Sequence, residues 1–504
     1  MSFVLRAKKL DISTGRQPVV VFYEPEAIKF GIHREDRVSL RSEHRHIEHA
    51  LADFTDTEVD RGEIGLFEEL WKEENIKDNE PIEIEVVKRP PSVEAIKKKL
   101  LGEELNYSEI YSIVKDVVDG HLSDIELTYF VATGFAEDWN NKELYYLAKA
   151  MAETGDRINL KGTVIDIHSI GGLPGDRTTM LCAPIAACLG FIIPKTSTRA
   201  ITSPSGVADT METLAKVDLT TAQIKNQAEK IHATLAWGGE DLNLAPADDK
   251  IIEISYPLAM EPYSKMVVSI MAKKIAMGVK YFVIELPVGA TAKVHSMDTA
   301  RELERKFIYI GKQFSMKVKV VKIPVYEPTG HGVGPALEAR DVLRVLQRKE
   351  NLSRTLERTA LRLVAYAAQL TGKYSFGKAY RASKAALEDG TAWHKMQQII
   401  KEQGPQKGIT PDIDSEDLIK KSDFTYDVEA THRGYVYAVD NYAINDLARI
   451  LGAPFDKRAG LYLHKRVREK VQVGDKLLTL YAENEERLDL GQKALRKLEI
   501  FDIR

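Results

Sequence analysis

The segment from Thr163 to Leu189 reads TVIDIHSIGGLPGDRTTMLCAPIAACL and combines a strand, a glycine-rich loop and a helix. Apolar, β-branched residues predict a strand over 163–167, and the apolar stretch 180–189 indicates a helix. The loop 166–176 contains three glycines, which let backbone N–H groups approach an anion near the positive end of the following helix. A tight turn without a ligand is the alternative, because glycine-rich turns are common. This order of elements is typical of an α/β fold.

Strands and helices keep alternating along the middle of the chain. Strands are predicted over 281–286 and 317–325, and the second is followed by a loop with three glycines around His331 and a helix from Ala336. A lone loop histidine is more often structural or solvated than catalytic, so His331 is given no role. These patterns predict a large α/β lobe.

Other parts of the chain have different patterns. Short runs such as Val19–Phe22 and the alternating Ile82–Val87 predict a small N-terminal β domain that ends before Pro90 and Pro91. Amphipathic stretches between Ser92 and Gly155 predict a helical lobe. Strand-like runs return near the C-terminus, which predicts a final domain rich in strands.

The composition limits the kinds of function. The chain has 504 residues, with 44% hydrophobic and 29% charged residues, and its length suggests about three or four domains. A formal net charge of -4 argues against a protein that coats nucleic acid. Cys182 and Cys188 share one predicted helix and are too far apart along it for a disulfide. Without a signal-peptide pattern or a long apolar run, we expect a cytoplasmic protein.

A second polar loop, Pro194–Gly206, gathers hydroxyl side chains next to Lys195 and Arg199. Charge-assisted donors and hydroxyls suit phosphate oxygens, and a solvated polar loop is the alternative. Ser269 and Lys273 are four residues apart, which places them on one face of a predicted helix. For this pair alone, a capped helix with exposed lysines is the favoured interpretation.

Two kinds of site are not indicated. No spacing of His, Cys, Asp or Glu points to a metal site, and we expect neither a metal ion nor a cofactor. No complete G-x-x-x-x-G-K-[ST] loop is present, which argues against a P-loop NTPase.

Together these stretches resemble the thymidine phosphorylase and pyrimidine nucleoside phosphorylase family. The matching segments, in chain order, are His168–Gly172 (H-S-T-G-G in the family), Ser197–Arg199 with Asp209 and Glu212 (S-x-R and D-x-x-E), Leu244–Asp248 and Ser269–Lys274. The resemblance covers about residues 92–490. Within the family, the chain resembles the archaeal AMP phosphorylases through its N-terminal extension of about 88 residues and through Arg199–Ser203, Trp237–Gly239 and Ala276–Gly278.

The resemblance implies a multidomain α/β protein. The expected domains are a small N-terminal β domain over 1–88 used for oligomerisation, a helical lobe over 89–160 rejoined by about 249–278, a large α/β phosphate-binding lobe over 161–248 and 279–420, and a C-terminal α+β domain over 421–504. The family places its site in a cleft between the helical and α/β lobes. It forms homodimers, and its AMP branch forms larger homo-oligomers.

The implied reaction is the phosphorolysis of a nucleoside 5′-monophosphate. AMP and inorganic phosphate give adenine and ribose 1,5-bisphosphate, with CMP and UMP as further substrates, and neither nucleic acid nor a membrane is an expected partner. Two departures bear on the substrate: Ile167 replaces the lysine that precedes His-Ser in thymidine phosphorylases, and their pyrimidine-gripping arginine has no counterpart near Ile254–Tyr256. The alternatives are a thymidine or uridine phosphorylase, a phosphoribosyltransferase of the anthranilate type, and a scaffold without catalysis.

The resemblance also implies roles for individual residues. Glu261, just before Pro262, matches the proton donor of the AMP enzymes and is the expected catalytic acid. The expected nucleotide-binding residues are Gly172, Thr198, Arg199, Ala200, Ile201, Thr202, Ser203, Val207, Ser269 and Lys293. The expected ligands of inorganic phosphate are His168, Ser169, Thr179, Ser197 and Lys273. The candidates for holding the 5′-phosphate are Lys195, Arg199 and Lys293.

Overall fold

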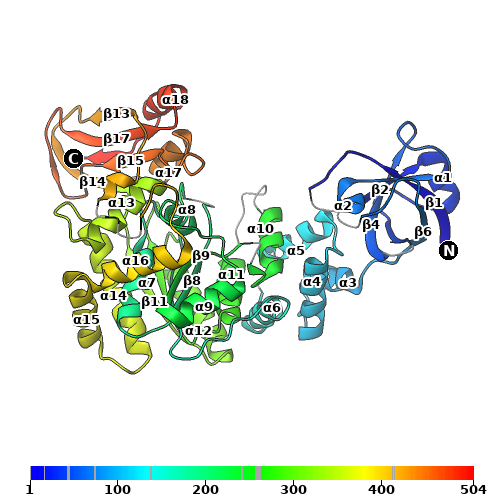
Figure 1. The fold of residues 1–504 in the computed structure, drawn as a ribbon, viewed down its shortest axis with the longest axis horizontal. Coiled ribbons are helices and arrows are strands. Elements are labelled where there is room, and N and C mark those ends of the chain that lie inside the picture. The colour runs from blue at the N-terminus through cyan, green and yellow to red at the C-terminus, as the bar shows by residue number, and fades with distance from the viewer. Residues whose placement is uncertain are drawn as a thin grey trace. The chain divides into compact units, whose positions relative to one another are not determined.

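The computed structural model describes residues 2–15, 18–42, 46–72, 75–136, 139–200, 203–239, 242–255, 263–410, 413 and 415–504. The chain forms two compact units, Met1–Thr154 with Pro246–Lys265 and Gly155–Ala245 with Met266–Arg504. Figure 1 shows the helices and strands of each unit, coloured along the chain. In the described ranges, no helix is long and apolar enough to cross a lipid bilayer.

The first unit begins with a closed barrel of six strands in the order β1-β5-β2-β4-β3-β6. Its elements are β1 (Ser2–Lys9), β2 (Val19–Tyr23), α1 (Glu24–Phe30), β3 (Arg37–Arg41), β4 (His46–Thr55), β5 (Glu63–Leu66), α2 (Glu68–Trp71) and β6 (Pro81–Val86). In β6, Ile82 and Ile84 are buried and Glu85 is exposed, as the period-two pattern predicts. The predicted N-terminal β domain is confirmed, and closure of the barrel leaves no unpaired sheet edge.

The helical lobe belongs to the same unit. It consists of α3 (Pro91–Leu100), α4 (Tyr107–Asp119), α5 (Asp124–Ala136), α6 (Asn141–Glu153) and α10 (Pro246–Ser255). A capping box is present at α5, where Ser123 and Glu126 each accept a hydrogen bond from the other's backbone N–H. Inside the lobe, the buried Lys99 ammonium pairs with Glu143 at 3.0 Å. The predicted helical lobe is therefore confirmed, but its second segment is Pro246–Lys265 and not 249–278, because the chain from Met266 onward packs with the α/β unit.

The second unit is built around parallel strands. β7 (Ile165–Ser169), β10 (Tyr281–Val288) and β11 (Lys317–Pro324) form a sheet in the order β11-β10-β7, and β8 (Ile193–Ser197) pairs with β9 (Ala233–Trp237). A parallel bridge between Val164 and Ile192 places β7 beside β8. The helices around these strands are α7 (Thr178–Cys188), α8 (Val207–Glu212), α9 (Thr221–Ile231), α11 (Tyr263–Ala276), α12 (Met297–Gln313), α13 (Pro335–Leu346), α14 (Arg354–Leu370), α15 (Phe376–Glu388) and α16 (Thr391–Gln403).

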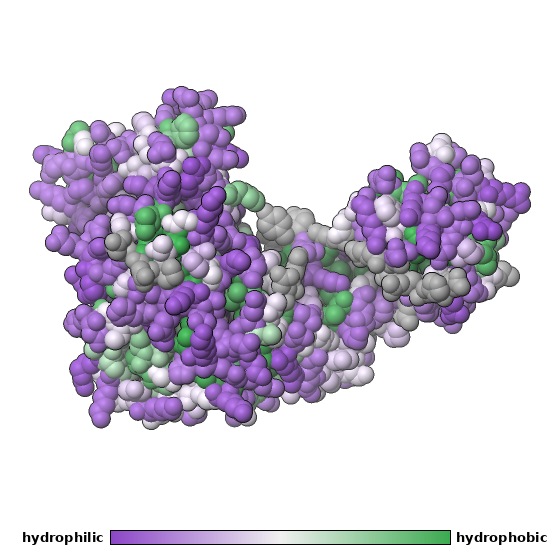
Figure 2. Space-filling view, viewed as in Figure 1, coloured by the Kyte–Doolittle hydropathy of each residue, from purple (hydrophilic) through white to green (hydrophobic). Residues whose placement is uncertain are grey.

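The packing of this unit follows from its parallel strands. Such strands need helices against them, and α7 packs on β7, β8 and β9 while α14 packs on β7, β10 and β11. The predicted α/β lobe is confirmed. Both cysteines, Cys182 and Cys188, lie on α7 and are free, so the expectation of no disulfide is also confirmed. On the face visible in Figure 2, hydrophilic residues cover most of the surface of both units.

One strand differs from its prediction in a way that matters for the site. β7 spans 165–169, two residues later than the predicted 163–167. Its pairing with β10 continues to Ser169, which lies opposite Glu285. His168 and Ser169 are therefore held by the end of a strand, because the sheet continues past the point where the apolar pattern stops.

The C-terminal domain completes the second unit and is α+β, as predicted. Its elements are β12 (Gly332–Val333), β13 (Phe424–Glu429), β14 (Gly434–Val439), α17 (Asn441–Ile450), β15 (Gly460–Leu463), β16 (Lys470–Val471), β17 (Lys476–Ala482), α18 (Glu485–Leu495) and β18 (Phe501–Ile503). The sheet order is β12-β15-β17-β13, and β12 comes from the glycine loop around His331, with Val333 opposite Leu461. This pairing attaches the loop to the C-terminal domain.

Candidate active site

The glycine-rich loop between β7 and α7 has the backbone geometry that its sequence predicts. Gly171 and Gly172 have φ of 84° and 82°, in the left-handed region that glycine tolerates best. At Gly175, a Cβ atom would lie 2.9 Å from the carbonyl oxygen of Gly332 and 3.0 Å from the amide nitrogen of Gly330. The two glycine-rich loops therefore approach each other as closely as backbone allows.

The hydroxyls beside this loop already have acidic partners. Ser169 donates to Asp176 at 2.7 Å, and Thr178 donates to Asp176 at 2.9 Å and to Glu285 at 2.6 Å. Burial raises the pKa of Glu285 well above its usual range, and the neighbouring charge of Asp176 raises it further. In this arrangement the Ser169 proton points at a carboxylate, so binding of an anion would require the hydroxyl to rotate.

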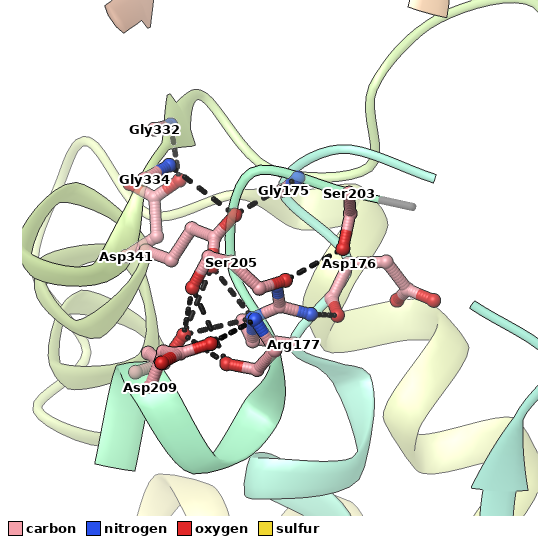
Figure 3. A network of polar contacts seen from close by, with 12 residues as sticks. Gly175, Asp176, Arg177, Ser203, Ser205, Asp209, Gly332, Gly334 and Asp341 are labelled. Carbon is pink, nitrogen blue, oxygen red and sulfur yellow. Dashed lines mark hydrogen bonds and ion pairs between the residues drawn. The ribbon is translucent and has the colours of Figure 1, made fainter. Parts of the chain in front are cut away.

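A buried ion pair between Arg177 and Glu338 stabilises the loop between β7 and α7. Figure 3 shows Arg177 within this network of polar contacts. Arg177 Nε donates to Glu338 at 2.6 Å and to the Thr210 hydroxyl at 2.9 Å, and a terminal nitrogen of Arg177 donates to the Ser205 carbonyl. Glu338 also accepts from the Gly175 amide at 3.3 Å. The side chains of Arg177 and Glu338 are 6% and 0% exposed, so this pair links the two predicted phosphate-binding loops away from water.

The second loop, between β8 and α8, is shaped by the acidic residues of the D-x-x-E signature. Asp209 accepts from the backbone amides of Ala200 at 2.7 Å and Gly206 at 2.9 Å. Lys457 of the C-terminal domain pairs with Asp209 and Glu212, each at 2.9 Å. The signature is therefore also a device that folds the loop and anchors it to the C-terminal domain.

Arg199 is engaged by several groups within its own region. Its guanidinium makes a bidentate pair with Glu212, at 2.8 and 2.9 Å, and contacts Asp218 at 3.3 Å. It also lies over the Trp237 ring, 4.7 Å from the centroid. Hydrogen bonding to Glu212 raises the pKa of Arg199 further, so the side chain is permanently charged. A substrate phosphate would meet a guanidinium whose charge is already balanced.

Lys195 is buried in the structure rather than open to a ligand. Its side chain is 2% exposed, and its Nζ lies 3.8 Å from Asp166 Oδ1. Lys274 approaches the same carboxylate at 2.6 Å. The sequence makes Lys195 a candidate for direct contact with a 5′-phosphate, and this burial contradicts that role.

His168 lies close enough to four lysines for their charges to act on it. Its Nδ1 is buried without a hydrogen-bond partner among the described residues. Burial lowers the pKa of His168 well below its usual value, and the nearby charges of Lys195, Lys274, Lys273 and Lys293 lower it further. His168 is therefore neutral at physiological pH, with positive charge around it.

Two of these lysines come from separate elements. Lys273 lies on α11 with Ser269, and both are partly exposed between buried neighbours such as Val268 and Met271. The predicted one-face arrangement of this pair is confirmed by the helix. Lys293 lies in the turn after β10, where the Gly289 amide donates to the Val294 carbonyl.

The remaining expected residues divide into two groups. Ser197 closes β8 and donates to the Ala236 carbonyl at 3.3 Å, and Thr179 is buried at the start of α7. Val207 opens α8, and the Thr198 carbonyl accepts from Ala208. Three expected residues, Ile201, Thr202 and Glu261, lie outside the described residues.

No motif in the sequence pointed to α17, which contacts three of the site loops. Asn441 donates to Thr291 Oγ1 at 3.0 Å, Asn445 donates to the Gly172 carbonyl at 3.0 Å, and Arg449 donates to the Ser203 carbonyl at 3.2 Å. These donors are spaced by four residues and so share one helix face. Buried asparagines on an otherwise apolar helix face were the signal available in the sequence.

Asn445→Ala is expected to raise the KM for the substrate bound by the glycine-rich loop about threefold to tenfold. Loss of one hydrogen bond costs about 0.5–1.5 kcal/mol, and the Gly172 carbonyl would lose its anchor at the centre of the loop. Steady-state kinetics would measure the change, and Asp446→Ala, an exposed neighbour on the same helix, is the matched control. Equal KM values in the two variants would mean that α17 does not position the loop.

Within the described part of the chain, one group could supply three ligands to a metal ion: Asp116, Asp119 and His121 in the helical lobe. His121 pairs with Asp116 at 3.1 Å, and Lys115 pairs with Asp119. These partners already satisfy the group, and it belongs to the other unit than the glycine-rich loops.

Comparison with known families divides the chain into three matched regions. Residues 93–155 match "Glycosyl transferase family, helical bundle domain", and residues 161–393 match "Glycosyl transferase family, a/b domain". Residues 435–500 match "Pyrimidine nucleoside phosphorylase C-terminal domain". All loops of the site described above lie within residues 161–393, whereas α17 lies within residues 435–500.

Three similar chains, matched over nearly their whole length, are AMP phosphorylases. The AMP phosphorylase of Pyrococcus furiosus is 42% identical over 99% of this chain and 97% of its own length. The AMP phosphorylase of Thermococcus kodakarensis is 40% identical over 97% and 96%, and AMP phosphorylase 1 of Archaeoglobus fulgidus 38% over 96% and 94%. Among solved structures, anthranilate phosphoribosyltransferase from Thermus thermophilus shares the fold with a TM-score of 0.52 at 16% identity, covering 61% of this chain and 99% of that one.

Proposed function

Because the chain belongs to the AMP phosphorylase family, we propose that it cleaves AMP with inorganic phosphate and releases adenine and ribose 1,5-bisphosphate. One observation carries the proposal. Val164 and Ile192 are bridged, and Ser169 and Ser197 each lie five residues beyond that bridge on adjacent strands, beside His168, on which the charges of four lysines act. Hydroxyl donors and positive charge gathered in this way suit a phosphate group.

The proposed chemistry is a displacement at the sugar. A phosphate oxygen bonds to C1′ while the C1′–N bond to the base breaks, and the sugar passes through an oxocarbenium-like state. The bonding electrons leave on the base nitrogen, and adenine departs as a neutral molecule once the base receives a proton. We assign that proton to Glu261, whose acid role would accelerate the step by about a hundredfold to ten-thousandfold.

The attacking phosphate would be held by His168, Ser169, Thr179, Ser197 and Lys273. A neutral His168 can donate one hydrogen bond to a phosphate oxygen, and the lysines around it keep it neutral. The Ser169 hydroxyl would turn from Asp176 to the phosphate. Holding the nucleophile against C1′ would remove much of the entropic barrier to the reaction.

The nucleotide would be held by the remaining loop residues. The proposed set is Gly172, Thr198, Arg199, Ala200, Ile201, Thr202, Ser203, Val207, Ser269 and Lys293. For the 5′-phosphate, Lys293 is the favoured cation, because its side chain is partly exposed in the turn after β10, whereas the side chain of Lys195 is buried and that of Arg199 is held by Glu212. Arg199 would then act mainly by keeping the second loop in shape.

The substrate assignment is tested by measuring phosphate-dependent release of free base from AMP, CMP, UMP, adenosine and thymidine in metal-free buffer. We expect the specificity constant for AMP to exceed that for adenosine by at least about tenfold, because a charge-assisted contact to the 5′-phosphate contributes about 1.5–3 kcal/mol. Equal specificity constants for AMP and either nucleoside would overturn the assignment and would support the alternative function, a nucleoside phosphorylase.

The remaining expectations about the assembly are also part of the proposal. We expect a cytoplasmic homodimer or larger homo-oligomer, with the N-terminal β domain making the contacts beyond the dimer. Light scattering of the full chain and of a chain without residues 1–88 measures this. A mass per particle that falls only by the deleted residues would contradict the role of that domain.

A further inference from the structure

Three charged side chains form a cluster in the interior of the α/β unit. Lys195, Asp166 and Lys274 are 2%, 1% and 3% exposed. Lys274 Nζ lies 2.6 Å from one oxygen of Asp166, and Lys195 Nζ lies 3.8 Å from the other. Two ammonium groups therefore share one carboxylate, and the cluster carries a surplus positive charge whenever both lysines are protonated. A buried, unbalanced charge is costly unless something nearby uses it.

The cluster lies directly behind the proposed phosphate site. Asp166 is on β7, two residues before His168, and Lys195 is on β8, two residues before Ser197. Lys274 is on α11 and follows Lys273. Each member of the cluster thus lies on the same element as a proposed phosphate ligand, and the charges of Lys195 and Lys274 act on His168 from within the protein.

The glycine-rich loop itself offers little positive charge to a phosphate dianion, and Lys273 on α11 is the one cation among the proposed phosphate ligands. Asp176 and Glu285 face its hydroxyls, His168 is neutral, and Ile167, fully buried, fills the position before His168. A dianion above this loop would be repelled by Asp176. A positive charge behind the loop would offset that repulsion strongly, because opposite charges interact more strongly in a buried site than in water.

The groups around Lys195 allow its protonation state to change when such a ligand binds. Burial lowers the pKa of Lys195 to about 7; Asp166 opposes this shift, and Lys274 adds to it. On α7, Cys182 faces the cluster as a neutral thiol, because burial raises its pKa. β9 carries no titratable side chain, and the charged residues of α9 are exposed.

We propose that Lys195 is a positioning residue for inorganic phosphate, which takes up a proton when the dianion binds and so supplies the positive charge that the loop lacks. The proposal rests on the proposed phosphate site, and it assigns to Lys195 an action through space rather than a contact. Asp166 and Lys274 hold the ammonium in place behind the loop.

The proposed role of Lys195 predicts how the affinity for a dianion depends on pH. Above about pH 7, Lys195 is mostly neutral in the free enzyme, and a bound dianion raises its pKa, so binding takes up a proton there. Affinity for a dianion should therefore fall as pH rises from about 7 to 9 and stay level below about 6.5. Sulfate is the suitable probe, since it remains a dianion across this range and does not itself titrate.

The test is calorimetry of sulfate binding to the full chain in buffers with different ionisation enthalpies, which counts the protons taken up. For the wild type we expect about one proton at pH 8 and almost none at pH 6. Lys195→Met should take up none at either pH and bind sulfate at least about tenfold more weakly at pH 6.5. Lys230→Met, which removes an exposed lysine paired with Glu402, is the control and should behave as the wild type.

A second measurement separates this role from a structural one. Lys195→Met leaves a balanced Asp166–Lys274 pair and should fold. The wild type should gain stability from about pH 7 to 9, where its unfolded state binds more protons, and the variant should gain less. Lys274→Met offers a second test. In this variant Lys195 is paired alone with Asp166 and should stay protonated, so sulfate binding should no longer take up a proton.

The outcomes are distinct from those that test the reaction. Wild-type proton uptake retained in Lys195→Met, or equal sulfate affinity at pH 6.5, would overturn the role of Lys195. So would the absence of sulfate-linked uptake in a wild type that cleaves AMP. If the wild type does not cleave AMP but shows proton uptake that disappears in Lys195→Met, the role of Lys195 in anion binding is supported and AMP is rejected as the substrate.

Discussion

Replacing Arg177 with methionine is expected to lower the free energy of unfolding by about 3–5 kcal/mol, because it leaves a buried carboxylate without its partner. Glu338 is completely buried and receives the Arg177 Nε at 2.6 Å, while Arg177 also binds the Ser205 carbonyl. Methionine keeps much of the length and removes the charge. Urea denaturation at pH 7 measures the loss, and Arg301→Met, which breaks an exposed pair with Asp298, should change little.

The same variant should respond to pH in a defined direction. Burial already raises the pKa of Glu338 despite the opposing charge of Arg177, and without Arg177 the pKa would rise further. A carboxyl whose folded pKa is raised costs stability at a pH above its ordinary value near 4.5, so the deficit should shrink from pH 7 toward pH 5. The double variant Arg177→Met with Glu338→Gln should recover part of the loss. A deficit independent of both pH and Glu338 would mean that Arg177 acts through packing alone.

The parts of the fold that could be predicted are those determined by the local sequence. Ile82 and Ile84 alternate with glutamates and form a barrel wall, and Ser123 with Glu126 caps α5. β10 and β11 were expected almost to their observed ends, because buried parallel strands consist of continuous apolar residues. The end of β7 was missed because pairing with β10 extends over the polar Ser169.

The parts of the site that were not predictable depend on contacts between distant segments. Arg177 meets Glu338 across 161 positions, and Asn445 reaches Gly172 across 273. No periodicity or spacing rule connects residues so far apart. The burial of Lys195 was missed for the same reason, because a lysine in a hydroxyl-rich loop is expected to be solvated. Asp166, its partner, carried no signal of its own.

Arg199 illustrates how one motif can support two interpretations. Its place in S-x-R beside many hydroxyls indicates phosphate binding, and its bidentate pair with Glu212 indicates a structural role. The D-x-x-E half of the signature supplies that partner, so the two halves fold each other. A motif can therefore identify a site correctly while the charge in it acts on the loop and not on the ligand.

The largest effect on catalysis is expected from Glu261→Gln, which should lower turnover on AMP by about a hundredfold to ten-thousandfold. The glutamine keeps the size and a hydrogen-bonding end but cannot deliver a proton to the departing base. Loss of a general acid lowers the turnover number with little change in binding, so the dissociation constant for AMP should change by less than about threefold. Single-turnover kinetics and equilibrium binding of AMP measure the two quantities separately.

The contrary interpretation is that Glu261 only favours the start of α11, which begins at Tyr263, since acidic residues stabilise helix N-termini. That role would contribute about 0.3–1 kcal/mol to stability and would leave turnover nearly intact. Glu253→Gln, at an exposed position on α10, is the matched control for loss of one carboxylate. Substrates with better leaving groups should suffer less from Glu261→Gln, because they need less protonation. If Glu261→Gln keeps more than about a tenth of the wild-type turnover on AMP, the proton must come from another group.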